Sequence, residues 1–322
     1  MADEARSRLV AGKYELLSPL GEGGMASVWR GVTHGAAGFT RTVAIKRVLP
    51  ALAHDAHFAA LFVEEARVVS DLQHPNIVQV HDFDQDEKGN YFIVMEWVEG
   101  LDLNRWIRSY LEVGARPPWA YVSAIAIEVL RALAAAHDRT TDEGLPVPVI
   151  HRDVTPSNIL LGKNGIVKLA DFGMARAMDR ASMTKPGTVK GKLSYMAPEI
   201  LYGQRATERS DIYGLGIVMW EAIAGKRLFS GGTDIDVVMR VRKGDVPPLA
   251  DERTDAPPAL AEIVHCALAR DPEDRFETAR GMLRALAGVL RTHPEPTDAT
   301  PLGASVRSAV IRLAGSGSVK GP

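Results

Sequence analysis

The amino-acid sequence has a single cysteine, almost no net charge and no long uninterrupted apolar run. Cys266 alone cannot form a disulfide framework, which fits a reducing compartment. The 38 basic and 40 acidic residues give a net charge of −2, which does not indicate a surface for nucleic acid or anionic membranes. Charged residues interrupt the most apolar stretches, 121–137 and 212–225, which fall short of the roughly 18 apolar residues of a membrane span. The first residues lack the layout of a signal peptide, so we expect a cytoplasmic protein without nucleic acid or membrane span.

Short β-prone runs come first in the chain, and long helical patterns follow. Tyr14–Leu20 and Thr42–Val48 are strand-like, and the apolar residues of Phe58–Leu72 recur at helical spacing. Strands followed by helices are typical of an α+β arrangement. The four expected segments are a short extension (1–13), a sheet-rich lobe (14–97), a helical lobe (98–290) and a tail (291–322).

The tail differs in composition from the rest of the chain. About half of residues 292–322 are Pro, Thr, Ser or Gly, as in linkers and disordered segments. Val306, Val310 and Leu313 would suit one or two helical turns. The composition nevertheless favours a disordered tail or a linker.

A glycine-rich turn spans residues 20–28, between two predicted strands. Glycine lets the backbone approach phosphate oxygens closely, although it serves ordinary hairpins as well. A strand follows the turn, which excludes a dinucleotide-binding fold, and the sequence has no Walker A motif. Downstream, Lys46 lies in a predicted buried strand, where a charge needs a partner. An ion pair with Glu65, on the next helix, would hold this lysine and aim it at phosphate.

Two further motifs complete a recognisable series. Residues 151–158 read HRDVTPSN, and DFG follows at residues 171–173. Together with the glycine-rich turn and Lys46, they resemble the motifs of the protein kinase family over residues 14–290. The sequence is similar in particular to that of bacterial, Hanks-type serine/threonine kinases. The resemblance implies a bilobal α+β fold, in which a five-stranded antiparallel sheet with one helix forms the small lobe and helices form most of the larger one.

The resemblance also implies transfer of the ATP γ-phosphate to hydroxyl groups of protein substrates, with Mg²⁺ as cofactor and Mn²⁺ as an alternative metal. Asp153 would accept the proton of the attacking hydroxyl. Asn158 and Asp171 would hold the metal, since both offer oxygen ligands. The residues implied to contact ATP are Leu20, Gly21, Glu22, Gly23, Gly24, Met25, Ala26, Ser27, Val28, Ala44, Lys46, Glu65, Met95, Glu96, Val98 and Leu160.

Two positions exchange the residue types that the family pattern carries. Thr155 stands where serine/threonine members have lysine, and Lys192 stands where they have threonine near the end of the activation segment. Our hypothesis is that Lys192 reaches across to Asp153 while Thr155 supplies the hydroxyl, because a flexible lysine can act from either side. The alternative is that the active-site lysine has been lost and the enzyme has little activity. A smaller departure is Ala26, in place of the third glycine of the turn, for which we expect a modest loss of phosphate contact.

Three residues outside the catalytic motifs are implied to support the large lobe. Glu199 and Arg275 would form a buried salt bridge, whose breakage leaves an unpaired charge. Asp211 would bind the backbone of the catalytic loop, although the local sequence fits a helix N-cap equally well.

Arg152 precedes the catalytic aspartate, where the family uses an arginine to bind a phosphate on the activation segment. The candidate phosphorylation sites are Ser182, Thr184 and Thr188, and a phosphate there would order the segment. Two other activities fit the fold: a nucleotide-binding pseudokinase scaffold and a small-molecule phosphotransferase. A tyrosine kinase is disfavoured because Pro156 follows the serine/threonine pattern.

Overall fold

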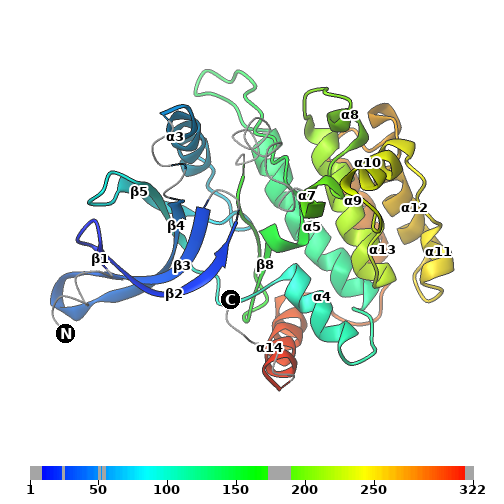
Figure 1. Ribbon diagram of the computed structural model, residues 1–322. Helices are drawn as coiled ribbons and strands as arrows, with labels where there is room; N and C mark the ends of the chain where they lie inside the picture. Colours follow the sequence, from blue (N-terminus) through cyan, green and yellow to red (C-terminus); the bar gives the residue numbers. More distant parts are fainter. Residues whose placement is uncertain (1–8, 24–25, 50–51, 53–55, 173–189, 316–322) are drawn as a thin grey trace.

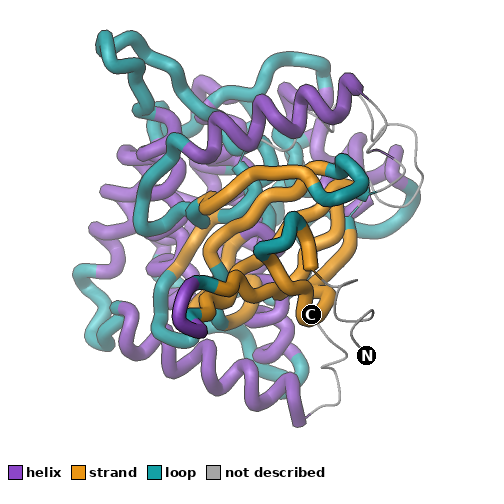
Figure 2. Tube along the Cα trace, turned by 90° about the vertical axis from the view of Figure 1, so that its left-hand side faces the viewer, coloured by secondary structure: helices purple, strands orange, loops and turns teal. Residues whose placement is uncertain are grey.

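The computed structural model describes residues 9–23, 26–49, 52, 56–172 and 190–315, which form two lobes (Figure 1). Strands dominate the small lobe, and Figure 2 shows them as a curled layer in front of the helices of the large lobe. The small lobe consists of β1 (Leu9–Val10), β2 (Tyr14–Glu22), β3 (Ala26–His34), η1 (Ala36–Gly38), β4 (Thr40–Val48), α3 (Ala56–Ser70), β5 (Val80–Gln85) and β6 (Tyr91–Glu96).

The six strands form one antiparallel sheet in the order β1-β2-β3-β4-β6-β5. The five expected strands are therefore present, and the short β1 adds a sixth at the edge. Because side chains alternate along a strand, β4 contributes to two separate clusters. Val43 and Ile45 join the cluster on one face, whereas Val48 packs on the other face with Phe62 of α3. Lys46 shares the face of Val48 by this alternation, so the sequence places it on the side that α3 covers.

The large lobe is built around two long helices, α5 (Trp119–His137) and α9 (Glu208–Ala224). Every residue of α9 from Ser210 to Ala224 is buried, and Trp220 is 1% exposed. Alone among the described helices, α5 is long and apolar enough to cross a membrane, but 72% of its apolar window is buried inside the protein, as in a core helix. The helices of this lobe are α4 (Leu103–Leu111), α5 (Trp119–His137), α7 (Lys190–Leu193), α8 (Pro198–Leu201), α9 (Glu208–Ala224), α10 (Asp234–Lys243), α11 (Leu249–Glu252), α12 (Pro258–Ala267), η4 (Pro272–Asp274) and α13 (Ala279–Leu290).

A small three-stranded sheet lies where the lobes meet. It consists of β7 (Gly100–Asp102), β8 (Ile159–Gly162) and β9 (Val167–Leu169), and the short helix η2 (Pro156–Asn158) leads directly into β8. β7 and β8 approach so closely that a Cβ on Gly100 would lie 1.8 Å from the carbonyl oxygen of Leu161. A glycine is therefore required where the chain passes from one lobe to the other.

The expectation of a disordered tail is wrong for residues Ala299–Gly315, which form the helix α14. Leu302, Val306, Ala309 and Leu313 are at most 3% exposed and follow the three- and four-residue spacing of one helix face. The Pro and Thr residues that suggested disorder lie mainly before the helix, and the Gly/Ser run follows it. Averaging the composition over 31 residues therefore hid a helix that burial of its apolar face stabilises.

Candidate active site

The nucleotide-facing side of the small lobe is set by strand register. Val28 lies opposite Lys46 in the β3–β4 pair, and Ala44 lies opposite Met95 in the β4–β6 pair. Opposite residues share a face, so these four side chains are on the same side of the sheet. A pocket opens beside Lys46 and Met95 and is bounded on the large-lobe side by Phe172. Its lining residues are Lys46, Ala66, Val69, Val78, Val80, Ile93, Met95, Asp171 and Phe172.

The glycine-rich turn closes this side of the lobe. Gly21 pairs with Val28 and Glu22 with Ser27, and the Gly23 N–H donates to the Ala26 carbonyl over 2.9 Å. A Cβ on Gly21 would meet nothing within 4 Å, so the backbone there borders open space that a ligand could occupy. Gly24 and Met25 lie outside the described residues. Of the other residues expected to contact ATP, Leu20, Val28 and Leu160 are half-buried.

Glu96 ends β6, and Val98 lies in the segment that follows and joins the lobes. The Glu96 N–H donates to the Gln79 carbonyl over 2.9 Å. A backbone contact from Glu96 to adenine would therefore come from its carbonyl oxygen rather than its N–H. The Glu96 side chain pairs with Lys168 of β9, at 2.8 Å between Oε2 and Nζ. The connecting segment is thus tied to the strand that leads into Asp171.

Lys46 contacts Asp171, with 2.8 Å between Nζ and Oδ1. Lys46 is 7% exposed, so its charge is buried and needs this kind of partner. Burial alone would raise the pKa of the Asp171 carboxyl, but the charge and hydrogen bond of Lys46 outweigh it and lower that pKa. Asp171 is therefore ionised at neutral pH, as a metal ligand must be. The side chain of Glu65, the predicted partner of Lys46, lies outside the described part of the chain.

Asp153 and Asn158 face each other across the catalytic loop. The Asn158 Nδ2 donates to the Asp153 carbonyl oxygen at 2.8 Å and to its Oδ2 at 3.0 Å. Because the amide nitrogen makes both bonds, the amide oxygen is the atom suited to a metal. Lys192 donates to the same Oδ2 of Asp153 over 2.8 Å, so the predicted contact between these two residues is present.

Thr155, the other half of the predicted exchange, is 5% exposed. Its Oγ1 lies 2.9 Å from the Oγ of Ser157, two residues further on. This contact holds the loop on itself just before η2, and the described contacts of Thr155 do not include Asp153. The structure therefore brings Lys192 to the catalytic aspartate and keeps Thr155 beside it in the loop.

Asp211 holds the backbone of the catalytic loop from below. Its two carboxylate oxygens accept from the N–H of His151 at 2.8 Å and of Arg152 at 2.7 Å. Arg152 has a φ of 68°, a conformation that non-glycine residues adopt only when their surroundings impose it. Thr207 is the N-cap of α9, so the alternative role of Asp211 as an N-cap is wrong.

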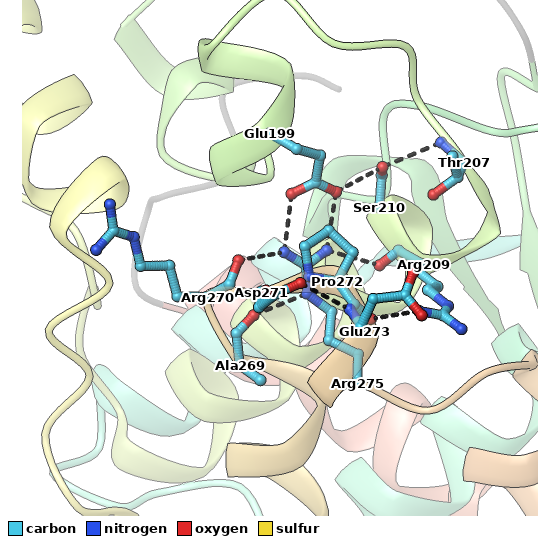
Figure 3. A network of polar contacts seen from close by, with 10 residues as sticks. All are labelled: Glu199, Thr207, Arg209, Ser210, Ala269, Arg270, Asp271, Pro272, Glu273 and Arg275. Atoms are coloured by element: carbon cyan, nitrogen blue, oxygen red, sulfur yellow. Dashed lines mark hydrogen bonds and ion pairs between the residues drawn. The ribbon is translucent and has the colours of Figure 1, made fainter.

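The predicted Glu199–Arg275 salt bridge is present and bidentate, with both N–O distances at 2.8 Å (Figure 3). The side chains of Arg275 and Glu199 are 0% and 6% exposed. Arg275 also donates to three backbone carbonyls, and Ser210 donates to Glu199 at 2.8 Å. This network joins α8, at the end of the activation segment, to α9 and η4.

A second buried network beneath the activation segment escaped sequence analysis. The Tyr195 hydroxyl donates to Glu221 at 2.5 Å, and Arg227 contacts both groups. The Tyr195 N–H donates to the Lys192 carbonyl over 3.0 Å. Burial raises the pKa of the Glu221 carboxyl. The sequence feature that could have indicated this network is the lone charge of Glu221 inside the apolar stretch 212–225, since a buried charge requires partners.

Comparisons with known proteins agree with this geometry. The protein kinase domain family matches residues 14–285. Tyrosine-protein kinase MasK of Myxococcus xanthus is 40% identical over 296 residues, which cover 92% of this chain and 46% of MasK. Serine/threonine-protein kinase PknL of Mycobacterium tuberculosis is 35% identical over 313 residues, covering 96% of this chain and 74% of PknL. The chain thus spans about half the length of MasK.

Solved structures show the same architecture. The crystal structure of the Mycobacterium tuberculosis PknI kinase domain is 30% identical, with a TM-score of 0.63 over 87% of this chain and 96% of that domain. The predicted bilobal α+β fold is confirmed. The candidate phosphorylation sites Ser182, Thr184 and Thr188 lie outside the described residues. By its sequence and its fold, the chain belongs to the protein kinase family, among the bacterial Hanks-type serine/threonine kinases.

Proposed function

We propose that this chain is an active kinase that transfers the γ-phosphate of ATP to serine and threonine hydroxyls of protein substrates, including its own activation segment. One observation carries the proposal: the carboxylates of Asp153 and Asp171 each hold a lysine at 2.8 Å. Phosphoryl transfer depends on positioning and charge neutralisation rather than on covalent chemistry. Two carboxylate–lysine pairs, one on each side of the transferred group, would provide both.

The reaction assigns each residue a definite role. The substrate hydroxyl oxygen forms a bond to the γ-phosphorus while the bond from that phosphorus to the bridging oxygen breaks and ADP leaves. Asp153 orients the hydroxyl and accepts its proton. Lys46 contacts the phosphates of ATP from the small-lobe side, and Lys192 lies beside the reacting oxygen. Neither lysine needs to lose a proton, since each acts by charge.

Asn158 and Asp171 would hold a divalent cation. An amide oxygen and an ionised carboxylate are ligands that Mg²⁺ accepts, and Mn²⁺ takes the same oxygen donors. Within the described residues no three His, Cys, Asp or Glu side chains form a metal cluster. Mg²⁺ at nucleotide sites is commonly held by one or two protein carboxylates together with the phosphates. When bound, the cation supplies charge neutralisation for those phosphates.

Lys192 replaces the lysine that the family carries on the catalytic loop. Its Nζ reaches Asp153 Oδ2, and its side chain remains 39% exposed, open to an incoming phosphate. We therefore treat the Thr155/Lys192 exchange as a functional rearrangement rather than as a loss. Arg152, with its N–H bound to Asp211, would meet a phosphate on Ser182, Thr184 or Thr188.

The exchange can be tested by substitution. Lys192→Met should lower kcat about 10²- to 10³-fold, the usual loss when one preorganised donor is removed. Lys243→Met, a 73% exposed lysine on α10, is the matched control and should leave kcat unchanged. A double variant with Thr155→Lys and Lys192→Thr should regain more activity than either single change. Activity of Lys192→Met close to that of the wild type would refute the proposed role.

Autophosphorylation with radiolabelled ATP tests the overall proposal. The wild type should incorporate label on serine or threonine, and Asp153→Asn should not. Tight Mg-ATP binding without incorporation by the wild type would instead indicate a pseudokinase scaffold. The 40% identity to MasK, a protein named as a tyrosine kinase, makes phosphotyrosine the second candidate. Phosphoamino-acid analysis of the labelled protein distinguishes the two.

A further inference from the structure

The helix α14 lies beyond residue 285, where the match to the protein kinase domain ends. It packs against α4, β7 and β8, next to the passage between the lobes (Figure 1). Leu302, Val306 and Leu313 are buried in the same apolar core as the large-lobe helices. The helix is therefore part of the folded kinase although it is not part of the matched domain.

Two glycines allow α14 to touch the turn between β8 and β9 through backbone atoms. A Cβ on Gly303 would lie 2.8 Å from both the Gly165 nitrogen and the Lys163 carbonyl oxygen. A Cβ on Gly165, which has a φ of +85°, would lie 1.8 Å from the Ala299 carbonyl oxygen. Because the obstructing atoms are backbone, neither side could yield by rotating a side chain. The contact is specific to glycine on both surfaces.

Polar contacts fix the rest of the helix. The Ser305 hydroxyl lies 2.8 Å from the Tyr110 hydroxyl and accepts from the Trp106 Nε1 at 3.0 Å. Trp106 is 0% exposed, so its N–H depends on this partner. Arg312 donates to Ser109 at 2.9 Å and lies 4.7 Å from the Tyr110 ring. These bonds hold α14 in one register along α4.

The turn that α14 contacts is connected to the nucleotide site at both ends. Arg307 of α14 donates to the Lys163 carbonyl, and the Lys163 N–H donates to the Glu99 carbonyl at 2.8 Å. Glu99 follows Val98 in the segment that joins the lobes. The strand before the turn, β8, carries Leu160 and continues directly from Asn158. A shift of the turn would therefore displace Leu160, the segment between the lobes and Asn158, the proposed metal ligand, together.

We propose that α14 is a positioning element of the ATP site, which braces the β8–β9 turn and, through it, the segment between the lobes. The inference rests on the proposed function, since ATP is the ligand of that site. A helix that only stabilised the fold would change the melting temperature but not the ATP affinity of the folded protein. A helix that positions the ATP site would change the affinity of the folded protein for ATP.

The test uses the full chain and Gly303→Ala. Alanine favours a helix over glycine, so any harm must come from the contact rather than from helix propensity. Gly315→Ala, in the same helix, meets nothing within 4 Å and is the matched control. Titration with a fluorescent ATP analogue should show roughly 2- to 30-fold weaker binding for Gly303→Ala, the range of coupling changes by residues outside a site. Gly315→Ala should bind like the wild type.

A second pair of variants covers the case in which Gly303→Ala does not fold. Ser305→Ala removes the partner of Trp106, and Ser308→Ala changes an exposed serine of the same helix. Weaker binding by Ser305→Ala, but not by Ser308→Ala, supports the inference. Wild-type affinity in a folded Gly303→Ala or Ser305→Ala protein, by circular dichroism, overturns it. Absence of analogue binding by the wild type would overturn the proposed function, and the inference with it.

Discussion

Replacing Arg275 by methionine should destabilise the large lobe more than any surface change. The substitution removes both bonds to Glu199 and leaves a carboxylate that is 6% exposed with the Ser210 hydroxyl as its remaining described partner. Breaking one side of a buried ion pair costs about 3–5 kcal/mol. The carbonyls of Ala269, Arg209 and Arg270 also lose their donor, so the upper part of that range is expected.

Urea denaturation followed by tryptophan fluorescence measures this loss, because Trp106 and Trp220 are at most 1% exposed and report on the large lobe. A double variant with Glu199→Met and Arg275→Met should be more stable than Arg275→Met alone, since it removes the unpaired charge. Arg280→Met, a surface arginine paired with Asp138, is the control and should cost less than about 1 kcal/mol. A loss below about 1 kcal/mol for Arg275→Met would show that the network does not stabilise the lobe.

Three further predictions follow from the same contacts. Asp211→Asn retains one acceptor for two backbone donors, so it should cost about 1.5–3 kcal/mol and lower kcat; equal stability by urea denaturation would contradict this. Tyr195→Phe removes one partner of the buried Glu221 and should cost about 1–3 kcal/mol in the same measurement. Glu199 has a lowered pKa: burial raises it, but Arg275 outweighs burial. Its contribution is therefore complete above the ordinary glutamate value of 4.5 and is lost as the pH falls through the lowered pKa, so the stability gap between wild type and Arg275→Met should shrink in acid.

The charged contacts of the site could be predicted because a charged side chain in a buried position needs a partner of opposite charge or a hydrogen-bonding group. A buried charge such as Lys46 has few acceptable environments. The contacts of Lys192 with Asp153 and of Asp211 with the loop backbone came from the family resemblance, because the local sequence alone fitted Asp211 equally well as a helix N-cap. The edge strand β1 is different: two residues, Leu9 and Val10, carry no periodic signal, and pairing with β2 alone makes them a strand.

The α14 helix could not be predicted because its stability is tertiary. An isolated helix of 17 residues with two glycines is marginal in water, and the local composition describes only that isolated state. What stabilises it is burial of its apolar face in the large-lobe core, where it packs on α4, and a glycine contact with a turn more than 130 residues away. Neither partner is visible in the sequence of the helix itself.

The exchange of Thr155 and Lys192 has a physical consequence for control. A lysine on the catalytic loop is held by the same backbone that holds Asp153, whereas Lys192 comes from the end of the activation segment. Its backbone carbonyl accepts from the Tyr195 N–H, and the Tyr195 hydroxyl is bound to Glu221 in the last turn of α9. The Lys192 ammonium therefore reaches Asp153 from a segment whose end is anchored on the large-lobe core. The contact with Asp153 and the anchoring of this segment thus depend on two residues that are three positions apart, Lys192 and Tyr195.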